Sequence, residues 1–238
     1  MRAWLNLRYT NDRRAKLFEK GLKRVGYKPD HGITQNPGSK DILITWNRIG
    51  QGNTTAKEFK RAGLPVLVVE NATWGNTFAD SNWYHIARNY HNTSGMFDVG
   101  DNQRWDSLGI FLDEWRQHGE TVILPQRGIG SAPVAMPRSF AKQAVRNHGG
   151  RVRPHPGVRQ CKLLEDDLAG CGKVITWGSG AAVKALMMGI KVESYMPNWI
   201  AEQDNTDEGR LQMLRRLAWA QWTHEEISSG DSFDRLLP

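Results

Sequence analysis

The sequence predicts an α/β protein with two parallel-sheet domains that face each other across a cleft and a long helix at the C-terminus. Residues 173–193 read as an apolar strand, a turn of small residues, a helix and a second strand. Residues 41–70 repeat this order, and both segments carry Ile-Thr-Trp before the turn. Because β-α-β connections are right-handed and produce parallel strands, each repeat predicts a doubly wound sheet whose loops open at the carboxyl ends of its strands.

The first predicted domain, residues 1–116, alternates strands and helices. Asn11 or Asp12 can cap a helix that follows a strand at residues 2–9. We expect another helix near Asp80, and a turn-rich loop at residues 91–104. The remaining elements are a strand at 41–46, a helix at 54–62 and a strand at 65–70, and the helix near Asp80 would carry Trp83, Tyr84, Ile86 and Ala87.

The second predicted domain, residues 117–238, begins near Arg116 and has the same alternation. It ends in the long helix, expected at about 207–228, whose Trp219 and Trp222 would hold one domain against the other. The earlier elements are a strand at 121–125, a helix at 138–147, a strand at 150–154, a helix at 161–169, a strand at 174–177 and the helix and strand that follow it.

The positive charge is concentrated in the first part of the chain. The net charge is +7, and residues 1–61 hold 14 Lys and Arg against 5 Asp and Glu, which leaves +9 there and −2 in the rest. An excess of this size favours a polyanionic partner, either nucleic acid or an acidic glycan, although helices also carry solvated Lys and Arg without a partner.

The cysteines and the hydropathy pattern predict a cytoplasmic protein. Cys161 and Cys171 are ten residues apart without a second pair or a histidine cluster, so we expect neither a disulfide framework nor a zinc site. No segment has the roughly 18 apolar residues of a membrane span, and residues 1–10 lack the apolar core of a signal peptide.

Polar and cationic residues follow three strands of the second domain. The sequences are Gln126-Arg127-Gly128, Arg151-Val152-Arg153-Pro154-His155-Pro156-Gly157 and Trp177-Gly178-Ser179-Gly180. The carboxyl ends of parallel strands meet at one edge of the sheet, and strand alternation places Arg151 and Arg153 on the same side. Cationic side chains, an imidazole and the helix end at Ser179 and Gly180 would then surround a diphosphate. The alternative is that the arginines form ordinary surface ion pairs.

In the first domain, two strands end in Trp46-Asn47-Arg48 and Glu70-Asn71. Glu70 follows the apolar run 65–69, so we expect it at the sheet edge, partly desolvated, with a raised pKa that suits a general base. The alternative role is to cap the following turn. Asp80 and His85 are less well placed candidates for the base.

Motifs that the chain lacks narrow the chemistry. There is no Asp-x-Asp pair of the kind that holds a donor through a divalent cation, so we expect a mechanism without a metal or other cofactor, in which Arg127, Arg153 and the helix dipole neutralise the phosphates. The phosphate-binding loop of ATPases and the Gly-x-Ser-x-Gly nucleophile elbow are also absent.

These motifs together resemble the GT-B glycosyltransferases, which have two Rossmann-like domains. The closest likeness is to the capsule-polysaccharide and Kdo transferases, through Arg-Pro-His-Pro at 153–156, Thr-Trp-Gly-Ser-Gly-Ala-Ala at 176–182 and Gly-Ile-Lys-Val at 189–192. The resemblance covers mainly residues 121–195, and it implies that Arg153, His155, Ser179 and Gly180 hold the diphosphate of a nucleotide-sugar, expected to be a UDP-sugar, with Glu70 as the base. The domains are smaller than is usual in this family.

The chain also resembles small bacteriophage proteins, through WNR, VVEN, RWDSLGI and LAWAQW. That likeness, with the basic first half, implies transfer of a sugar to a hydroxymethylated or hydroxylated base in double-stranded phage DNA in the host cytoplasm. Two alternatives stay open: a non-catalytic nucleotide- or nucleic-acid-binding protein, and a transferase that acts on a surface glycan. The expected donor-binding residues are Gln126, Arg127, Arg153, His155, Trp177, Ser179 and Gly180, and the expected DNA-binding residues are Asn47, Arg48, Asn71 and Trp74, whose ring would stack on the base.

Overall fold

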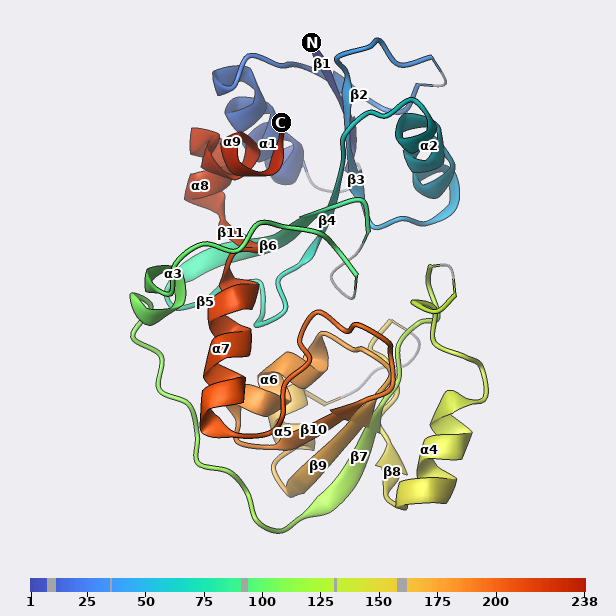
Figure 1. Ribbon diagram of the computed structural model, residues 1–238, viewed down its shortest axis with the longest axis vertical. Coiled ribbons are helices and arrows are strands. Elements are labelled where there is room, and N and C mark those ends of the chain that lie inside the picture. Colours follow the sequence, from blue (N-terminus) through green and yellow to red (C-terminus); the bar gives the residue numbers. More distant parts are fainter. Residues whose placement is uncertain (8–11, 35, 91–93, 131, 158–161) are drawn as a thin grey trace. The chain divides into compact units, whose positions relative to one another are not determined.

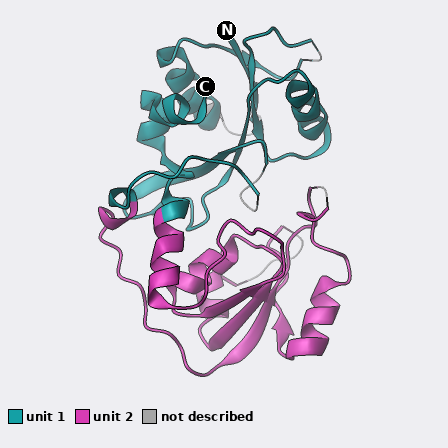
Figure 2. Cartoon of the chain, viewed as in Figure 1, with its two compact units in different colours: residues 1–104, 216–238 teal, residues 105–215 magenta. Residues whose placement is uncertain are grey.

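The computed structural model describes residues 1–7, 12–34, 36–90, 94–130, 132–157 and 162–238 (Figure 1). The chain forms two compact units, shown in Figure 2: unit 1 is Met1–Arg104 with Arg216–Pro238, and unit 2 is Trp105–Arg215. This division differs from the predicted one, because the last 23 residues belong to unit 1. Arg116, expected at the boundary, lies within unit 2, where Nη1 donates to the carbonyls of Leu168 at 2.7 Å and Cys171 at 3.0 Å.

Unit 1 contains a seven-stranded mixed sheet. Its strand order is β11-β6-β4-β3-β1-β2, with β5 paired to β6. The four strands at one side are parallel: β1, β3 and β4 are strands that the sequence predicts, whereas β2 was not predicted. β6 pairs antiparallel with both β4 and β11. The bounds are β1 Arg2–Asn6, β2 Lys28–His31, β3 Ile42–Trp46, β4 Val66–Asn71, β5 Thr77–Phe78, β6 Ser81–Arg88 and β11 Gln221–Thr223.

Helices cover both faces of this sheet (Figure 1). On one face, α1 (Asp12–Arg24), α8 (His224–Ser229) and α9 (Asp231–Leu236) enclose a core that includes Phe18, Leu22 and Phe233. On the other face, α2 (Gly50–Arg61) packs Phe59 against Leu43 and Val68. Because apolar side chains alternate between two covered faces, β3 and β4 read in the sequence as continuous apolar runs.

The helix predicted near Asp80 is wrong, because this segment is the strand β6. Residues 83–87 are all buried, since β6 lies between β4 and β11 with both of its faces covered. An apolar run of this length does not distinguish a buried strand from a buried helix by its periodicity. The pairing places His85 opposite Glu70 and Tyr84 opposite Asn71.

The single long helix predicted at 207–228 is also wrong. The segment forms α7 (Asp207–Ala218), then β11, then α8. The Arg104 guanidinium donates to the carbonyl of Ala218 at 2.8 Å and to that of Gln221 at 2.6 Å, which satisfies the backbone where α7 ends. Thr223 then begins α8 with a capping box that it shares with Glu226.

The two tryptophans of this segment pack within unit 1. Trp222 is 2% exposed and belongs to the core beneath α1. The Trp219 indole donates to the carbonyl of Asp101 at 2.9 Å and its ring adjoins Gly100. The aromatic face that the sequence predicts is therefore used inside one unit.

Unit 2 contains a four-stranded parallel sheet in the order β10-β9-β7-β8. Val122, Ile123, Val174 and Ile175 form its buried centre. The predicted strand–helix alternation is confirmed here, although the helix expected at 161–169 shortens to α5 and Cys161 lies outside the described residues. The bounds are β7 Glu120–Leu124, β8 Arg151–Val152, β9 Cys171–Thr176, β10 Lys191–Ser194, α4 Phe140–His148, α5 Leu164–Asp167 and α6 Ala181–Met187; α3 (Gln103–Asp106) precedes them.

Candidate functional site

The carboxyl ends of β7, β8 and β9 lie at one edge of the unit 2 sheet, because β7 pairs with both of the other strands. Side chains tie the loops together there. Thr176 Oγ1 donates to the carbonyl of Leu124 at 2.8 Å, and Gln126 Nε2 donates to the carbonyl of Gly178 at 2.6 Å. Gln126, predicted to touch the donor, thus holds the β7 and β9 loops in register. We call this edge the unit 2 rim.

Arg127 and His155 meet at this rim. A Cβ atom placed on Gly157 would lie 3.2 Å from His155 Nδ1 and 3.6 Å from Arg127 Cδ, so both side chains border the same glycine. His155 Nδ1 accepts a hydrogen bond from the Gly157 N–H at 2.9 Å. The neutral ring therefore carries its proton on Nε2, which is a donor. A cation and an N–H donor side by side suit a phosphate oxygen.

The pKa of His155 is lowered from the ordinary value of 6.5, first by burial and then by the positive charges of Arg127 and Arg153. Both effects disfavour a second proton on the ring. His155 is therefore neutral at pH 7 and donates through Nε2 without adding a charge of its own.

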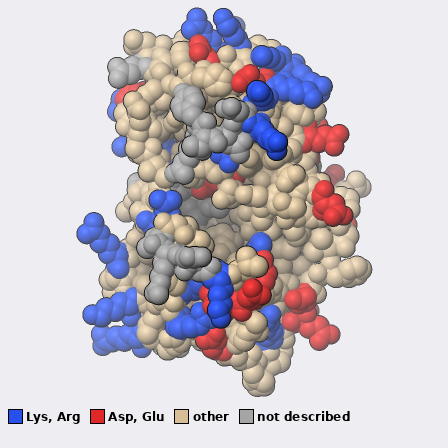
Figure 3. Space-filling view, turned by 180° about the vertical axis from the view of Figure 1, so that it is seen from behind, with Lys and Arg blue, Asp and Glu red and all other residues tan. Residues whose placement is uncertain are grey.

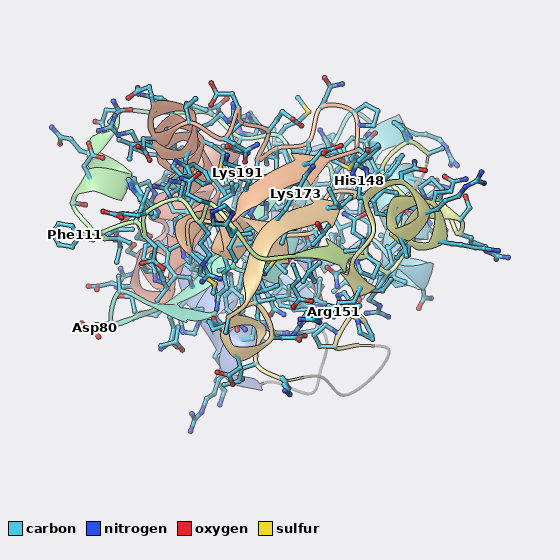
Figure 4. All side chains as sticks on the ribbon, turned by 90° about the horizontal axis from the view of Figure 1, so that it is seen from below. Asp80, Phe111, His148, Arg151, Lys173 and Lys191 are labelled. Atoms are coloured by element: carbon cyan, nitrogen blue, oxygen red, sulfur yellow. The ribbon has the colours of Figure 1, made fainter. Side chains whose placement is uncertain are left out.

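Arg153 itself is buried and engaged in an ion pair. Its side chain is 5% exposed, its Nε lies 2.8 Å from Asp167 Oδ2, and its Nη2 donates to the carbonyl of Lys162 at 3.0 Å. Arg151, at the start of β8 in Figure 4, lies 2.9 Å from the other oxygen of Asp167 and also pairs with Glu120. Arg151 and Arg153 lie on the same side of the strand, as predicted, but both bind Asp167 there. The alternative of ordinary ion pairs holds for Arg151, and the burial of Arg153 does not fit direct coordination of a diphosphate.

The turn before α6 uses its polar groups internally. The Ser179 N–H donates to Thr176 Oγ1 at 2.9 Å, and Ser179 Oγ accepts from the Ala181 N–H at 3.3 Å. The predicted anion site does not fit these bonds at Ser179, whose amide is used inside the turn; the role predicted for the Gly180 amide stays a prediction. Gly178 is required by packing, because a Cβ there would lie 3.1 Å from the Trp199 ring. Trp177 donates to the carbonyl of Pro133 at 3.0 Å and shapes the rim.

In unit 1, Glu70 and Asn47 meet at the carboxyl ends of β4 and β3. With its amide oriented to satisfy both neighbours, Asn47 Nδ2 donates to Glu70 Oε1 at 2.7 Å and Oδ1 accepts from Trp46 Nε1 at 3.2 Å. Asn47 adopts a left-handed conformation with φ of 56°, which asparagine tolerates. The carboxylate of Glu70 is half-buried and held by an amide donor. We call this edge of the sheet the unit 1 rim.

Three further residues adjoin this rim and were missed by the sequence reasoning: Arg14, Tyr84 and His224. The Arg14 guanidinium carbon lies 3.7 Å from the centre of the Trp46 ring, and Arg14 Nε donates to the Tyr84 hydroxyl at 3.1 Å. Tyr84 in turn stacks on His224 with ring centres 5.0 Å apart. Burial, and then the charge of Arg14, lowers the pKa of His224. The only sequence signal was chemical type, since these residues are far apart in the chain.

Arg48 and Trp74, expected to contact DNA, are buried. Arg48 is 7% exposed, donates from Nη1 to the carbonyl of Asn89 at 2.5 Å and lies over the Tyr90 ring. Trp74 is 1% exposed and stacks on Phe78 with ring centres 5.2 Å apart. Such burial does not fit phosphate contact by Arg48 or base stacking by Trp74, because neither side chain has enough exposed surface to meet a ligand.

The remaining candidates have ordinary local roles. Asn71 is exposed and its Oδ1 accepts from Asn76 at 3.1 Å. His85, considered as a base, is fully buried with Nδ1 2.7 Å from the amide nitrogen of Gln221. Asp80 is exposed in the turn between β5 and β6 (Figure 4). Glu70 is therefore the acidic candidate that lies at a sheet rim in contact with polar neighbours.

The described residues contain neither a cluster of metal ligands nor a helix that could cross a membrane. Among them, no three His, Cys, Asp or Glu side chains are grouped so as to hold a metal ion. None of the helices in the described ranges combines the length and apolar character needed to span a bilayer. Cys171 is buried in β9, and burial raises the pKa of its thiol.

Comparisons with known proteins identify the fold. No protein-family model and no curated sequence matches the chain. Among solved structures, the Thermosulfurimonas dismutans KpsC β-Kdo 2,4 transferase has a TM-score of 0.56 and 14% identity, covering 92% of this chain and 90% of that one. The KpsC β-Kdo 2,7 transferase from the same organism has a TM-score of 0.54 and 10% identity, covering 97% and 99%. At these identities the likeness is one of fold: this chain has a mixed α/β fold with parallel sheets, similar to that of the KpsC Kdo transferases.

Proposed function

We propose that this protein is a glycosyltransferase that moves a sugar from a nucleotide-sugar donor to a hydroxyl acceptor. The observation that carries the proposal is that Arg127 and His155 both border Gly157 at the unit 2 rim, where His155 keeps an N–H donor at Nε2. Ligands of open α/β sheets bind outside the carboxyl ends of the strands, which is where these groups lie. The fold likeness to two Kdo transferases supports the same reaction class.

The donor phosphate is placed against Arg127 and His155. Arg127 supplies a planar cation, and His155 supplies an uncharged N–H, so the leaving phosphate gains one positive charge and one hydrogen bond at this position. Arg153 has no direct contact with the phosphate in this proposal, because it is buried and paired with Asp167. In this proposal Arg127 supplies the positive charge that a metal ion supplies in other transferases.

The acceptor hydroxyl is placed at the unit 1 rim, where Glu70 is the general base. Glu70 takes the hydroxyl proton while the acceptor oxygen bonds to the anomeric carbon and the bond from that carbon to the phosphate oxygen breaks. The hydrogen bond from Asn47 orients the Glu70 carboxylate. A base needs a fixed direction toward the proton it removes, and this amide supplies it.

For the acceptor we favour a hydroxymethylated or hydroxylated base in duplex phage DNA, modified in the host cytoplasm. The +9 charge of residues 1–61 supports this choice. The names of the fold neighbours support a second acceptor class, a saccharide, and an activated Kdo beside UDP-sugars as donor. Each donor is therefore combined with hydroxymethylated DNA, plain DNA and a Kdo-terminated oligosaccharide, and sugar attachment is read by mass spectrometry.

Matched variants test the two rims separately. Arg127→Gln should weaken donor binding by roughly tenfold to 100-fold, because a hydrogen bond to a charged group contributes about 1.5–3 kcal/mol. Arg138→Gln, which removes an exposed cation of the same unit, is the control and should bind normally. Glu70→Gln should abolish transfer but retain donor binding, whereas a non-catalytic binding protein would be indifferent to it. If no nucleotide-sugar binds and no acceptor gains a sugar, the proposal is refuted.

A further inference from the structure

The exposed face of α1 is strongly cationic. Five side chains on this helix are exposed and basic, and at 100° per residue they fall within a wedge of about 100° opposite the packed face. We call this surface the α1 basic face, and it consists of Arg13, Lys16, Lys20, Lys23 and Arg24. Figure 3 shows Lys and Arg side chains in several groups on the face of the molecule that it draws.

Little of this charge is neutralised within the described part of the helix. Glu19 is the acidic side chain of α1 that the structure describes, and it lies 2.9 Å from His31 but 3.9 Å from Lys23. The opposite face of α1 is occupied, since Phe18 and Leu22 are fully buried and Gly21 lies directly against the Ile227 backbone. The helix therefore has no free apolar face with which to enter a lipid surface, unlike the amphipathic helices that bind membranes.

The first turn of α1 leads to the unit 1 rim. Arg14, next to Arg13 in the chain, lies over Trp46 at 3.7 Å. Trp46 contacts Asn47, which holds Glu70. A polymer that lies along the α1 basic face is therefore directed at its end toward the proposed general base.

We infer that the α1 basic face binds the phosphate backbone of double-stranded DNA and delivers a nucleotide to the unit 1 rim; its delivery role rests on the proposed function, whereas the binding does not. From Arg13 to Arg24 the helix extends about 16 Å at 1.5 Å per residue. Duplex DNA offers one negative charge per roughly 1.7 Å along its axis, so several phosphates are within reach. Lysine contacts phosphate as a point charge, which suits recognition without sequence preference.

The test measures binding of a labelled plain duplex by fluorescence anisotropy over a series of salt concentrations, with no sugar donor. The variant is Lys16→Gln, Lys20→Gln and Arg24→Gln together. The control is Arg138→Gln, Lys142→Gln and Arg146→Gln, which removes the same number of exposed cations from unit 2. Circular dichroism confirms that both proteins are folded.

The logarithm of the association constant falls linearly with the logarithm of salt concentration, and we expect the magnitude of this negative slope to decrease by about 3 in the α1 variant, since each phosphate contact contributes about 0.9. The control should keep the wild-type slope. Equal losses in the two variants, or no duplex binding by the wild type, would overturn the inference. So would tighter binding, dependent on α1, to an anionic polysaccharide or to phosphatidylserine vesicles.

The outcome is separable from that of the proposed function. Suppose that the α1 variant loses duplex binding and that the wild type transfers no sugar. This result supports the inference about α1 and refutes the DNA glycosyltransferase. Suppose instead that the α1 variant transfers sugar to DNA with an unchanged Michaelis constant for DNA. This result supports the proposed glycosyltransferase activity and refutes the role of α1 in DNA binding.

Discussion

Asp167 is the residue whose removal tests the arrangement beneath the unit 2 rim. Its two carboxylate oxygens lie 2.9 Å from Arg151 Nη1 and 2.8 Å from Arg153 Nε. Asp167→Asn leaves Arg153, which is 5% exposed, without its counter-charge while keeping the side-chain shape. Asp166→Asn is the matched control, because Asp166 is the exposed neighbour and loses the same charge.

The magnitude follows from the burial of Arg153. Removing one partner of a buried ion pair costs about 3–5 kcal/mol, because the remaining charge stays desolvated. We expect the lower end, about 3 kcal/mol, because the Arg153 Nε–H is not aligned with the carboxylate as a hydrogen bond and an Asn oxygen still accepts from one arginine. The ion pair of Asp167 with half-exposed Arg151 contributes little to this loss of stability, because solvent screens it.

Hydrogen exchange of unit 2 measures this loss directly, since two compact units need not unfold together. Amides of β7 and β9 should exchange roughly 100-fold faster in Asp167→Asn, which is the equivalent of about 3 kcal/mol. Asp166→Asn should exchange at the wild-type rate. Indistinguishable exchange in the two variants would refute the view that Asp167 stabilises the rim through the buried Arg153.

Three further predictions concern charged groups elsewhere in the chain. Arg104→Ala should lower the free energy of unfolding by about 3 kcal/mol in urea titrations, because the half-buried Glu226 carboxylate loses a bidentate partner, and a loss below 1 kcal/mol would contradict this. The hydrogen bond from Lys60, and then Arg48, lowers the pKa of Tyr90, so Lys60→Met should move that pKa up toward 10.0 in ultraviolet titration, and an unchanged value would show that Lys60 does not act. The free energy of unfolding of the wild type should decrease as the pH falls below 6.5, because His155 binds a proton more readily in the unfolded chain than in the folded protein. His155→Gln should remove part of this decrease. An identical pH profile in this variant would refute the contribution of His155.

Most strands were predictable because buried strands consist largely of consecutive apolar residues. Residues 42–44 and 66–69 are apolar throughout, since helices cover both faces of the sheet. The same property produced the error at 81–88, where the buried, mostly apolar stretch 83–87 also fits a buried helix. Only the hydrogen bonds to β4 and β11, which come from distant segments, decide that β6 is a strand.

The part of the candidate site that depends only on parallel strand topology was predictable. Strand ends that meet at one edge bring Arg127 and His155 together, and no further information is needed for that step. The partners of individual groups were not predictable. The sequence contains many carboxylates that might have paired with Arg153, and the choice of Asp167 depends on where α5 packs. The Ser179 amide likewise donates to Thr176 Oγ1, a partner that the sequence reasoning did not identify.

The amino-acid sequence by itself determined the alternating α/β pattern, the excess of cations in the first 61 residues and the polar strand ends of both halves, because these depend on residue type and on short spacing. The tertiary structure alone decided that Arg48 and Trp74 are buried, that Arg14 lies over Trp46, and that the chain returns to unit 1 at its end. The physical reason is that desolvation and ion pairing depend on which segments come together in space. A charge or an aromatic ring becomes a ligand contact or a core contact only through neighbours that lie far away in the sequence.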